Sequence, residues 1–417
     1  MKKIVSILCL MMAICMFAGC VKIPGNPNSE VNPVDTNIQS ANYYEAFDTY
    51  IKNSDKFKDE NFIASPTSLR AALCLAIAGA DEGTLDELLK AAGFESKEDA
   101  EKWYKSVVEM TEQFKKELEE ENKEAESHDW YDGKKADRAF EIVNSIWNNE
   151  DRSSDFKQAY KDYVHDAYGA EARSEKAAVL ADEINKWCDE KTHGMIPHII
   201  DDAEDISAVL ANALYLRTTW LNEFWYGGTH EDVFTCKDGS ETKKMFMSQA
   251  DEQYRYYEND KSRIVILPMA GNISFVCVLG DASDINEKIA HANDWEYAHI
   301  HLVLPKLDIE STFKEDMIAF LNSRGAKLPF GDAANFSSMS ESEDWYIKSI
   351  IQKARIKSDE KGLEAAAVTA IMMDAMGALI EEPEIIDFIA NKPFSFFIYS
   401  DIYEESREML FCGQLVK

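Results

Sequence analysis

Residues 359–370 read DEKGLEAAAVTA. This stretch decides the fold, because two physical interpretations of it conflict. Alanine, leucine, glutamate and methionine are strong helix formers, so intrinsic propensity predicts an amphipathic helix over residues 363–379. The neighbouring β-branched residues Val368 and Thr369 instead suit a strand, and Gly362 allows the backbone to turn at the start of the stretch. The rest of the sequence is needed to decide between the helix and the strand.

The body of the chain mixes helical and strand-like patterns. Helical patterns cover residues 43–56, 68–78, 84–92, 97–126, 155–168 and 181–190. Strand patterns cover residues 140–147, 207–216, 264–268, 273–279, 300–304, 346–356, 385–389, 394–398 and 408–415. They do not alternate as regular βαβ units, and no Pro- or Gly-rich break divides the chain after Asn42. We therefore expect one α+β domain over residues 42–417.

The N-terminus has the composition of a targeting segment. Two lysines precede an uncharged run, residues 4–17, which is short for a membrane span but suits the core of a signal peptide. The run ends in FAGC at 17–20, which resembles a bacterial lipobox, so residues 1–19 are predicted to be a lipoprotein signal peptide. Cys20 would then carry the lipid. The alternative is an ordinary signal peptide that leaves Cys20 free. Residues 20–41 hold prolines, Asn and Ser without an apolar period, and are predicted to be a disordered tether.

The net charge limits the kind of partner. The chain has 417 residues, with 76 acidic and 44 basic ones, and a formal net charge of -32. An anionic surface repels phosphate backbones, so no nucleic-acid partner is expected. We expect an extracellular monomer, held at the surface of a bacterial membrane through the lipid at Cys20.

Motifs of catalytic chemistry are missing from the sequence. It contains no G-x-G-x-x-G, Walker loop, G-x-S-x-G or H-E-x-x-H, so no enzyme and no cofactor are expected. His299 and His301 would share one face of a strand, where hydrogen bonding is expected over a metal site. Five cysteines are scattered without C-x-x-C spacing and are predicted to be small core residues, not a disulfide framework or zinc site: Cys74, Cys188, Cys236, Cys277 and Cys412.

Several segments resemble the serpin family, in the family's order. They are the N-x-x-x-S-P-x-S opening at 61–68, INKW at 184–187 with Thr192, Gly194 and Ile196, NALY at 212–215 with Trp220 and Phe224, LPK at 304–306, the block 325–330, NKPF at 391–394, and LFCG at 410–413. The match runs from about residue 41 to 417. A serpin-like fold is therefore expected, with a large central mixed sheet, surrounding helices, smaller sheets and an exposed reactive-centre loop at about 360–390.

The resemblance assigns residues 359–370 to the hinge of that loop. The implied hinge residues are Glu360, Gly362, Leu363, Glu364, Ala365, Ala366, Ala367 and Val368. Small side chains let such a segment slip between paired strands, whereas a charge or a proline would oppose it. Counting along the loop as in the family places the reactive bond at Met376–Gly377, with fallback positions at Met373, Ala375 and Leu379.

The implied activity is inhibition of a serine protease by a suicide-substrate mechanism. The protease would cleave the loop and stay attached as an acyl-enzyme, while the loop inserts into the central sheet. Methionine before the bond suits an elastase- or chymotrypsin-like enzyme. The resemblance also implies a sheet-opening cluster of Ser65, Ser68, Asn212, Gln352 and Trp220, where Gln352 replaces a family histidine. Helix capping by the serines and core packing of Trp220 are simpler interpretations.

Two alternatives remain at this stage. The first is a non-inhibitory serpin-fold lipoprotein that is cleaved as a substrate or acts as a binding module. Its support is Leu363, where many inhibitory members have Thr or Ser, together with Gln352 and the long stretch at 377–391. The second is an unrelated solute-binding lipoprotein.

Overall fold

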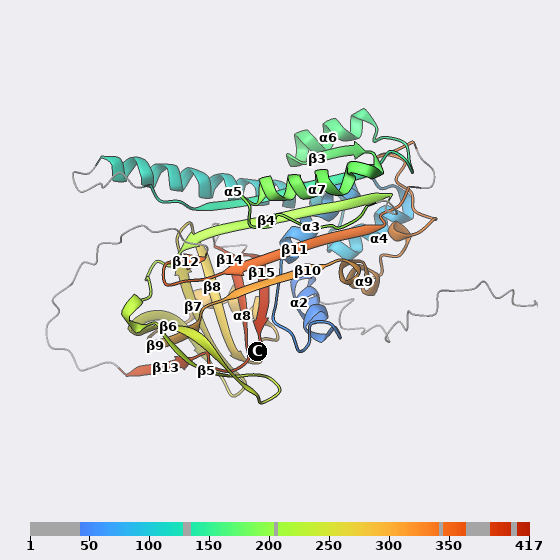
Figure 1. Ribbon diagram of the computed structural model, residues 1–417. Coiled ribbons are helices and arrows are strands. Elements are labelled where there is room, and N and C mark those ends of the chain that lie inside the picture. Colours follow the sequence, from blue (N-terminus) through green and yellow to red (C-terminus); the bar gives the residue numbers. More distant parts are fainter. Residues whose placement is uncertain (1–41, 128–134, 204–206, 342–344, 364–383, 402–406) are drawn as a thin grey trace, which may run out of the picture. The chain divides into compact units, whose positions relative to one another are not determined.

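The computed structural model describes residues 42–127, 135–203, 207–341, 345–363, 384–401 and 407–417 (Figure 1). Its strands form two sheets. The larger sheet contains β1 (Phe62–Ala64), β5 (His230–Thr235), β6 (Glu241–Glu258), β7 (Ser262–Met269), β8 (Ile273–Gly280), β9 (Tyr297–Pro305), β13 (Ile385–Ile389), β14 (Phe394–Ser400) and β15 (Glu408–Leu415). Its order is β1-β15-β14-β8-β7-β6-β9-β13, and β5 pairs with β6.

The second sheet carries the candidate site. It contains β2 (Ala139–Asn149), β3 (Glu171–Glu175), β4 (Ala208–Thr219), β10 (Asp308–Phe313), β11 (Ser349–Lys357) and β12 (Gly362–Leu363). Its order is β10-β11-β4-β2-β3, and β12 pairs with the end of β4. The sheet is mixed, because β11–β4 and β2–β3 are parallel while β10–β11 and β2–β4 are antiparallel.

Helices surround both sheets. They are α2 (Tyr43–Asn53), α3 (Pro66–Gly79), α4 (Glu82–Ala92), α5 (Lys97–Glu126), α6 (Gln158–Tyr168), α7 (Ala177–Lys191), α8 (Ile285–Ala290) and α9 (Glu315–Ser323). Short 3₁₀ turns lie at Tyr226–Gly228, Ala292–Asp294 and Leu328–Phe330. No helix among the described residues combines the length and apolar composition that a membrane crossing requires.

Helix α3 lies in the core between the sheets. Ser65 is its N-cap, with a side chain that accepts a hydrogen bond from the Ser68 backbone N–H at 3.1 Å, and Pro66 occupies the first turn. Nearly every residue of α3 is buried, and the helix packs against β15, β4 and β2. A helix that is apolar on all sides is stable only inside the molecule, so α3 fixes the position of the second sheet.

The second sheet is covered on both faces. Even-numbered residues of β4 such as Leu210, Leu214 and Leu216 belong to the cores that contain α3 and the larger sheet, whereas odd-numbered Ala211 and Ala213 pack under α7 (Figure 1). Burial on both faces explains why β4 is an almost continuous apolar run.

The predicted elements are largely present. The helix predicted at 97–126 has the observed bounds of α5, and the five scattered cysteines are all buried and free. Other bounds shift: α6 begins at Gln158 instead of residue 155, and β11 begins at Ser349 instead of residue 346. The strands β1, β3, β5, β6 and β10 and the helices α8 and α9 were not predicted.

One prediction at the hinge needs correction. The helix predicted from Leu363 is wrong at its first residue, because Leu363 pairs with β4 as part of β12, and a tertiary contact there overrides local propensity. The remainder of that segment lies outside the described residues. On either side of it, Gly362–Leu363 and Ile385–Ile389 are strands.

Candidate functional site

Strands β4 and β11 run side by side for only part of their length (Figure 1). Their parallel pairing covers four positions, from Ser349 opposite Val209 to Gln352 opposite Asn212. Beyond this point β4 keeps β2 as a partner and β11 keeps β10, yet no pair in the described chain joins β4 to β11. The second sheet is therefore closed near the start of β4 and open toward its end.

The last closed position is tied to helix α3. The Ser65 backbone N–H donates to Gln352 Oε1 at 3.0 Å, and Gln352 Nε2 donates to the Ser65 carbonyl at 2.8 Å. The Ser65 hydroxyl donates to the Leu410 carbonyl of β15 at 2.6 Å. All three residues are buried, so the single Gln352 amide satisfies two backbone groups that water cannot reach. This amide holds the end of the closed half against the core.

Asn212, the residue of β4 opposite Gln352, is hydrogen-bonded to the neighbouring strand β2. The Asn212 amide donates to Asn144 Oδ1 on β2, and the Asn144 amide donates to the Tyr104 hydroxyl of α5 at 2.8 Å. Asn212 Oδ1 is buried and finds no hydrogen-bond partner among the described residues. A buried acceptor without a donor is costly, which makes this junction a place where a new strand could add a bond.

The hinge begins at the open end of the sheet. Gly362 and Leu363 pair in antiparallel fashion with Thr219 and Thr218 at the end of β4. A Cβ on Gly362 would lie 2.2 Å from the Thr218 carbonyl oxygen, so only glycine allows this close approach of the two backbones. Gly362 was expected to serve a turn; in the structure it serves strand pairing.

Leu363 points into the core. It is 2% exposed and packs within the same apolar cluster as Leu216 and Ile356. These three residues also line a cavity of about 10 Å³, the size of a single water, between the open parts of β4 and β11. The space directly ahead of the hinge thus has room for little more than one methyl group, which is the side chain of the alanines that follow.

A buried carboxylate anchors the hinge from the other side. Glu360 accepts hydrogen bonds from Lys306 Nζ at 2.8 Å and from the Thr229 hydroxyl at 2.7 Å, and its side chain is 4% exposed. Burial alone would raise the pKa of Glu360, but the bonds from Lys306 and Thr229 outweigh it and lower that pKa overall. Glu360 is therefore held as a carboxylate at neutral pH.

Trp220 lies at this anchor, apart from the junction cluster. Its backbone N–H donates to the Lys361 carbonyl at 2.8 Å, and its indole N–H donates to the Asp359 carbonyl at 2.9 Å. The ring packs edge-on against Phe224 and Phe275. Trp220 thus combines core packing with two hydrogen bonds that fix the start of the hinge. The structure brings Ser65, Ser68, Asn212 and Gln352 together and places Trp220 at the far end of β4.

The sequence singled out Glu360 and Trp220 but missed their partners. Lys306 lies in the quoted LPK segment without an assigned role, and Thr229 carried no signal at all. The hinge residues from Glu364 to Val368, the reactive bond at Met376 and Gly377, its fallback positions and Cys20 lie outside the described residues.

Other features do not compete with this site. His299 bonds Asp251 at 2.7 Å and Gln253 at 2.9 Å, and His301 bonds Asp387 at 2.8 Å, so both histidines are hydrogen-bonded. In the portion of the chain that the structure describes, no three His, Cys, Asp or Glu side chains gather as a metal site.

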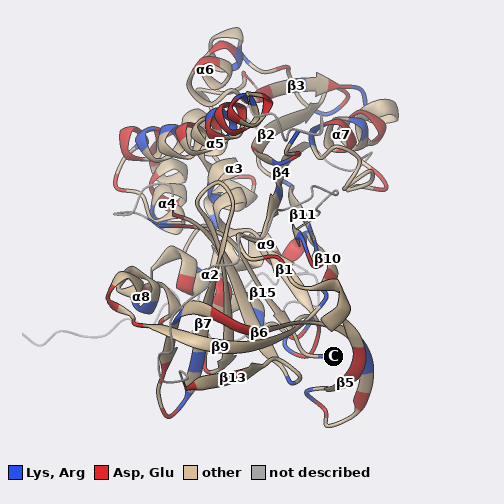
Figure 2. Ribbon diagram, turned by 90° about the vertical axis from the view of Figure 1, so that its left-hand side faces the viewer, with Lys and Arg blue, Asp and Glu red and all other residues tan. Residues whose placement is uncertain are grey.

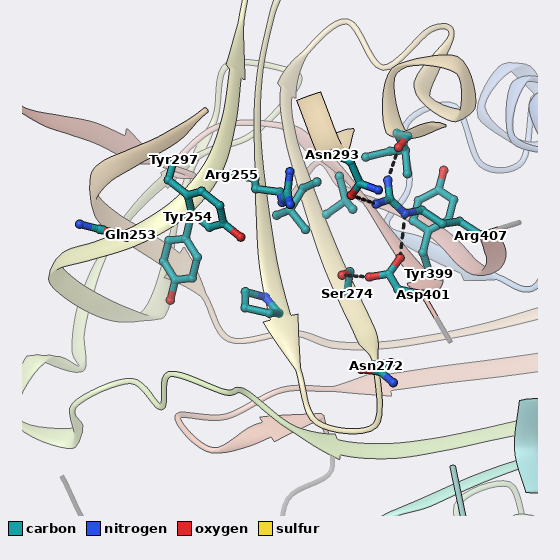
Figure 3. A pocket seen from close by; sticks show the side chains of 14 residues that line it. Gln253, Tyr254, Arg255, Asn272, Ser274, Asn293, Tyr297, Tyr399, Asp401 and Arg407 are labelled. Atoms are coloured by element: carbon teal, nitrogen blue, oxygen red, sulfur yellow. Dashed lines mark hydrogen bonds and ion pairs between the residues drawn. The ribbon is translucent and has the colours of Figure 1, made fainter. Parts of the chain in front are cut away.

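A pocket of about 220 Å³ opens beside β8 and β14 (Figure 3). At one side of the pocket, Arg407 pairs with Asp401 at 3.2 Å and donates to Asn293 at 2.7 Å, and the Ser274 hydroxyl donates to Asp401. Among the predicted site residues that the structure describes, none lines this pocket.

Comparison with known proteins agrees with this architecture. The family model described as serpin (serine protease inhibitor) matches residues 40–417, so the chain belongs to the serpin family. Serpin-Z1A of Triticum aestivum is 31% identical over 395 residues, which cover 88% of this chain and 92% of that protein. The leukocyte elastase inhibitor of Sus scrofa is 28% identical over 403 residues, covering 91% and 98%.

Solved structures confirm the predicted serpin fold. The native state of Tengpin, a thermophilic serpin, matches with a TM-score of 0.73 and 27% identity over 95% of this chain and 97% of that one. Serpin48 of Tenebrio molitor matches with a TM-score of 0.71 and 23% identity over 90% and 96%.

Proposed function

We propose that this chain is an inhibitory serpin, which traps a serine protease when its cleaved loop inserts between β4 and β11. The observation that carries the proposal is the open half of the second sheet, with Gly362 and Leu363 already paired at its mouth. An incoming strand there would find a row of backbone groups on each side, because β4 and β11 do not pair with each other beyond Asn212 and Gln352.

The observed pairing supports one register for the proposed insertion. Leu363 lies opposite Thr218 in antiparallel pairing, so each further loop residue meets the preceding residue of β4. Glu364 would meet Arg217, and Val368 would meet Ala213. The segment from Glu364 to Val368 would therefore pair with the part of β4 that does not pair with β11. It ends at Val368, which is also the last residue of the hinge implied by the sequence.

The register also assigns faces. Directly opposite residues share a face, so Ala365 and Ala367 would face the core with Leu216 and Leu214. Their methyl groups fit the small cavity ahead of Leu363. Glu364 would lie beside Arg217 on the outer face, where opposite charges attract.

Insertion beyond the hinge must open the closed half. Thr369 is the first residue that would meet a paired position, Asn212. The Thr369 hydroxyl would arrive on the same face as Asn212, whose Oδ1 has no hydrogen-bond partner in the described structure. A donor at this point offsets part of the loss of the β4–β11 pairing.

The proposed trap depends on an ester bond between the protease and the inhibitor. The protease serine attacks the Met376 carbonyl, the amino group of Gly377 leaves, and an ester joins the protease to Met376. The new end of the chain is then free to insert. Met376 is the thirteenth residue after Leu363, so at about 3.3 Å per residue a fully inserted strand would place the ester about 43 Å beyond Leu363. The uncleaved form is kinetically trapped, because the paired junction at Asn212 and Gln352 must open first.

Methionine at position 376 supports an apolar specificity in the target protease. An uncharged, flexible side chain suits the apolar pocket of an elastase- or chymotrypsin-like protease and gains nothing from a charged pocket. The leukocyte elastase inhibitor among the relatives supports the same class of partner.

A gel assay tests the proposal. The purified chain is mixed with pancreatic elastase, chymotrypsin and trypsin, then boiled in detergent. We expect a covalent adduct with elastase or chymotrypsin and none with trypsin, and mass spectrometry of the released peptide should place the cut after Met376. Clean cleavage without an adduct would favour the alternative of a substrate or binding module. After cleavage the melting temperature should rise; an unchanged value would contradict insertion.

The N-terminus supports a second part of the proposal. The lipobox-like FAGC at 17–20 and the tether at 20–41 suit a lipoprotein of a bacterial cell surface, where a diacylglyceryl group and an N-acyl chain at Cys20 anchor a monomeric inhibitor. Labelling of cells with an alkyne analogue of palmitate should mark the protein. A Cys20→Ser variant should lose the label and leave the membrane fraction; retention of both would contradict the anchor.

A further inference from the structure

A groove lies between the last turns of α5 and the start of β2, which Figure 2 shows side by side. Its volume is about 750 Å³, in the range of pockets that hold small organic ligands. Its apolar lining includes Phe114, Leu118, Phe140 and Ile142, and the two phenylalanine rings meet edge-on at 5.8 Å. The groove is separate from the hinge and from the junction at Asn212.

The wall of the groove is a helix that continues past the core. Phe114 is the last buried residue of α5, although the helix runs on to Glu126. Near its end, the Asn122 side chain accepts from the Ala136 N–H at 2.8 Å and donates to the Ala136 carbonyl at 3.3 Å. These bonds tie the helix to the chain entering β2. The wall is therefore fixed at both ends and open between them.

One buried donor in the groove has no acceptor. Strand alternation places Arg138 on the same face as Phe140 and Ile142, and Arg138 lines the groove with a side chain only 9% exposed. Its terminal nitrogen pairs with Glu121, but its Nε–H has no hydrogen-bond partner among the described residues. A buried N–H without a partner is costly, so this donor indicates a missing acceptor.

We propose that the groove binds a single-chain amphiphile with one carboxylate, such as a fatty acid. The acyl chain lies along the apolar lining, and the carboxylate accepts from Arg138 Nε–H in a charge-assisted bond. Four basic side chains and four glutamates line the groove, so its formal charge is balanced and a multiply charged head group gains nothing there: Lys115, Lys123, Lys135, Arg138, Glu112, Glu119, Glu126 and Glu141.

Displacement of fluorescent cis-parinaric acid by palmitate tests the proposal, on the full chain carrying Cys20→Ser so that no attached lipid competes. We expect saturable binding of palmitate, with 1-hexadecanol at least about tenfold weaker because it lacks the charge. Arg138→Met should weaken palmitate about tenfold and leave hexadecanol unchanged. The matched control is Lys116→Met on helix α5. Lys116 is 66% exposed and does not line the groove, so this variant should bind palmitate as the parent does.

Equal affinity for the acid and the alcohol, or palmitate binding by Arg138→Met at the parental level, would overturn the proposal, as would a lack of saturable binding. If Arg138→Met fails to fold, Leu118→Glu carries the test, because Leu118 is only partly buried. This variant should abolish binding of both ligands, and unchanged binding would exclude the groove as the site.

Discussion

The two halves of strand β4 differ in what lies beside them. From Val209 to Asn212 the strand pairs with β11, whereas from Ala213 to Thr219 the described structure gives it only two residues of β12 on that side. Both halves are apolar and β-forming, so β4's own sequence does not cause the difference. The closed half ends where Gln352 is tied to Ser65.

This difference indicates where the barrier to the proposed insertion would lie. In the proposed register, the hinge from Glu364 to Val368 would meet only positions of β4 that do not pair with β11, so its entry would break no strand pairing. Thr369 and the residues after it would have to displace β11 from β4. We make four predictions from this division of β4 into an open half and a closed half.

The largest effect is expected for Ala367→Arg. In the derived register this side chain faces the core opposite Leu214, and burial of an unpaired charge costs several kcal/mol. The variant should still be cleaved but form at least about tenfold less covalent adduct on the gel. The matched control is Glu381→Arg, which adds a positive charge beyond the candidate bonds and should keep its adduct. Full inhibition by Ala367→Arg would contradict the register.

Gln352→Ala should weaken the closed half of the β4–β11 pair and lower the stability of the protein. It leaves the Ser65 N–H and carbonyl without their buried partner, so the free energy of unfolding of the uncleaved protein should fall by about 2–4 kcal/mol in urea. Arg355→Ala, three residues along the same strand, removes an exposed pair with Asp308 and should cost less than about 1 kcal/mol. Equal losses for the two variants would show that the junction has no special role.

Glu360→Gln should change how the anchor responds to acid. Because the folded-state pKa of Glu360 is lowered, its stabilisation is complete above the unfolded carboxyl value of about 4.3 and is lost as pH falls through the folded value. At pH 7 the variant should lose about 1.5–3 kcal/mol, and its melting temperature should approach that of the parent below about pH 4. A constant difference in melting temperature between the variant and the parent from pH 7 to below pH 4 would refute the role of the ionised Glu360 carboxylate.

The smallest effect is expected for Thr369→Val. It removes the hydroxyl that would meet Asn212 Oδ1, so the cleaved form should lose about 0.5–1.5 kcal/mol while the uncleaved form keeps its stability. Thr369→Ser retains the hydroxyl and should behave as the parent. A loss confined to the uncleaved form would mean that Thr369 acts elsewhere.

Local signals predicted much of the fold but missed several strands. Helix α5 was placed correctly because its N-cap Ser96 and its charged pattern are local. Strand β6 was missed because it is polar and because its pairing with β9 shifts between Gln249 and Glu252, so no single alternation runs along it. Leu363 was assigned to a helix because its strand partner, Thr218, lies far away in the chain.

The site was predictable only in part. The family pattern singled out Ser65, Asn212, Gln352 and Trp220, but it gave neither their partners nor the division of β4 into two halves. Glu360 depends on Lys306 and Thr229, which approach it only after the two sheets pack together. Such contacts between distant residues leave no period or spacing that a single sequence could reveal.

Hydrogen exchange of backbone amides can detect a new strand between β4 and β11. Exchange is followed by mass spectrometry for residues 213–217 of β4 and 353–357 of β11, before and after cleavage of the loop. We expect exchange in both segments to slow by at least about tenfold after cleavage, because an inserted strand would pair with both edges. Unchanged exchange in these segments after complete cleavage would contradict insertion at this place.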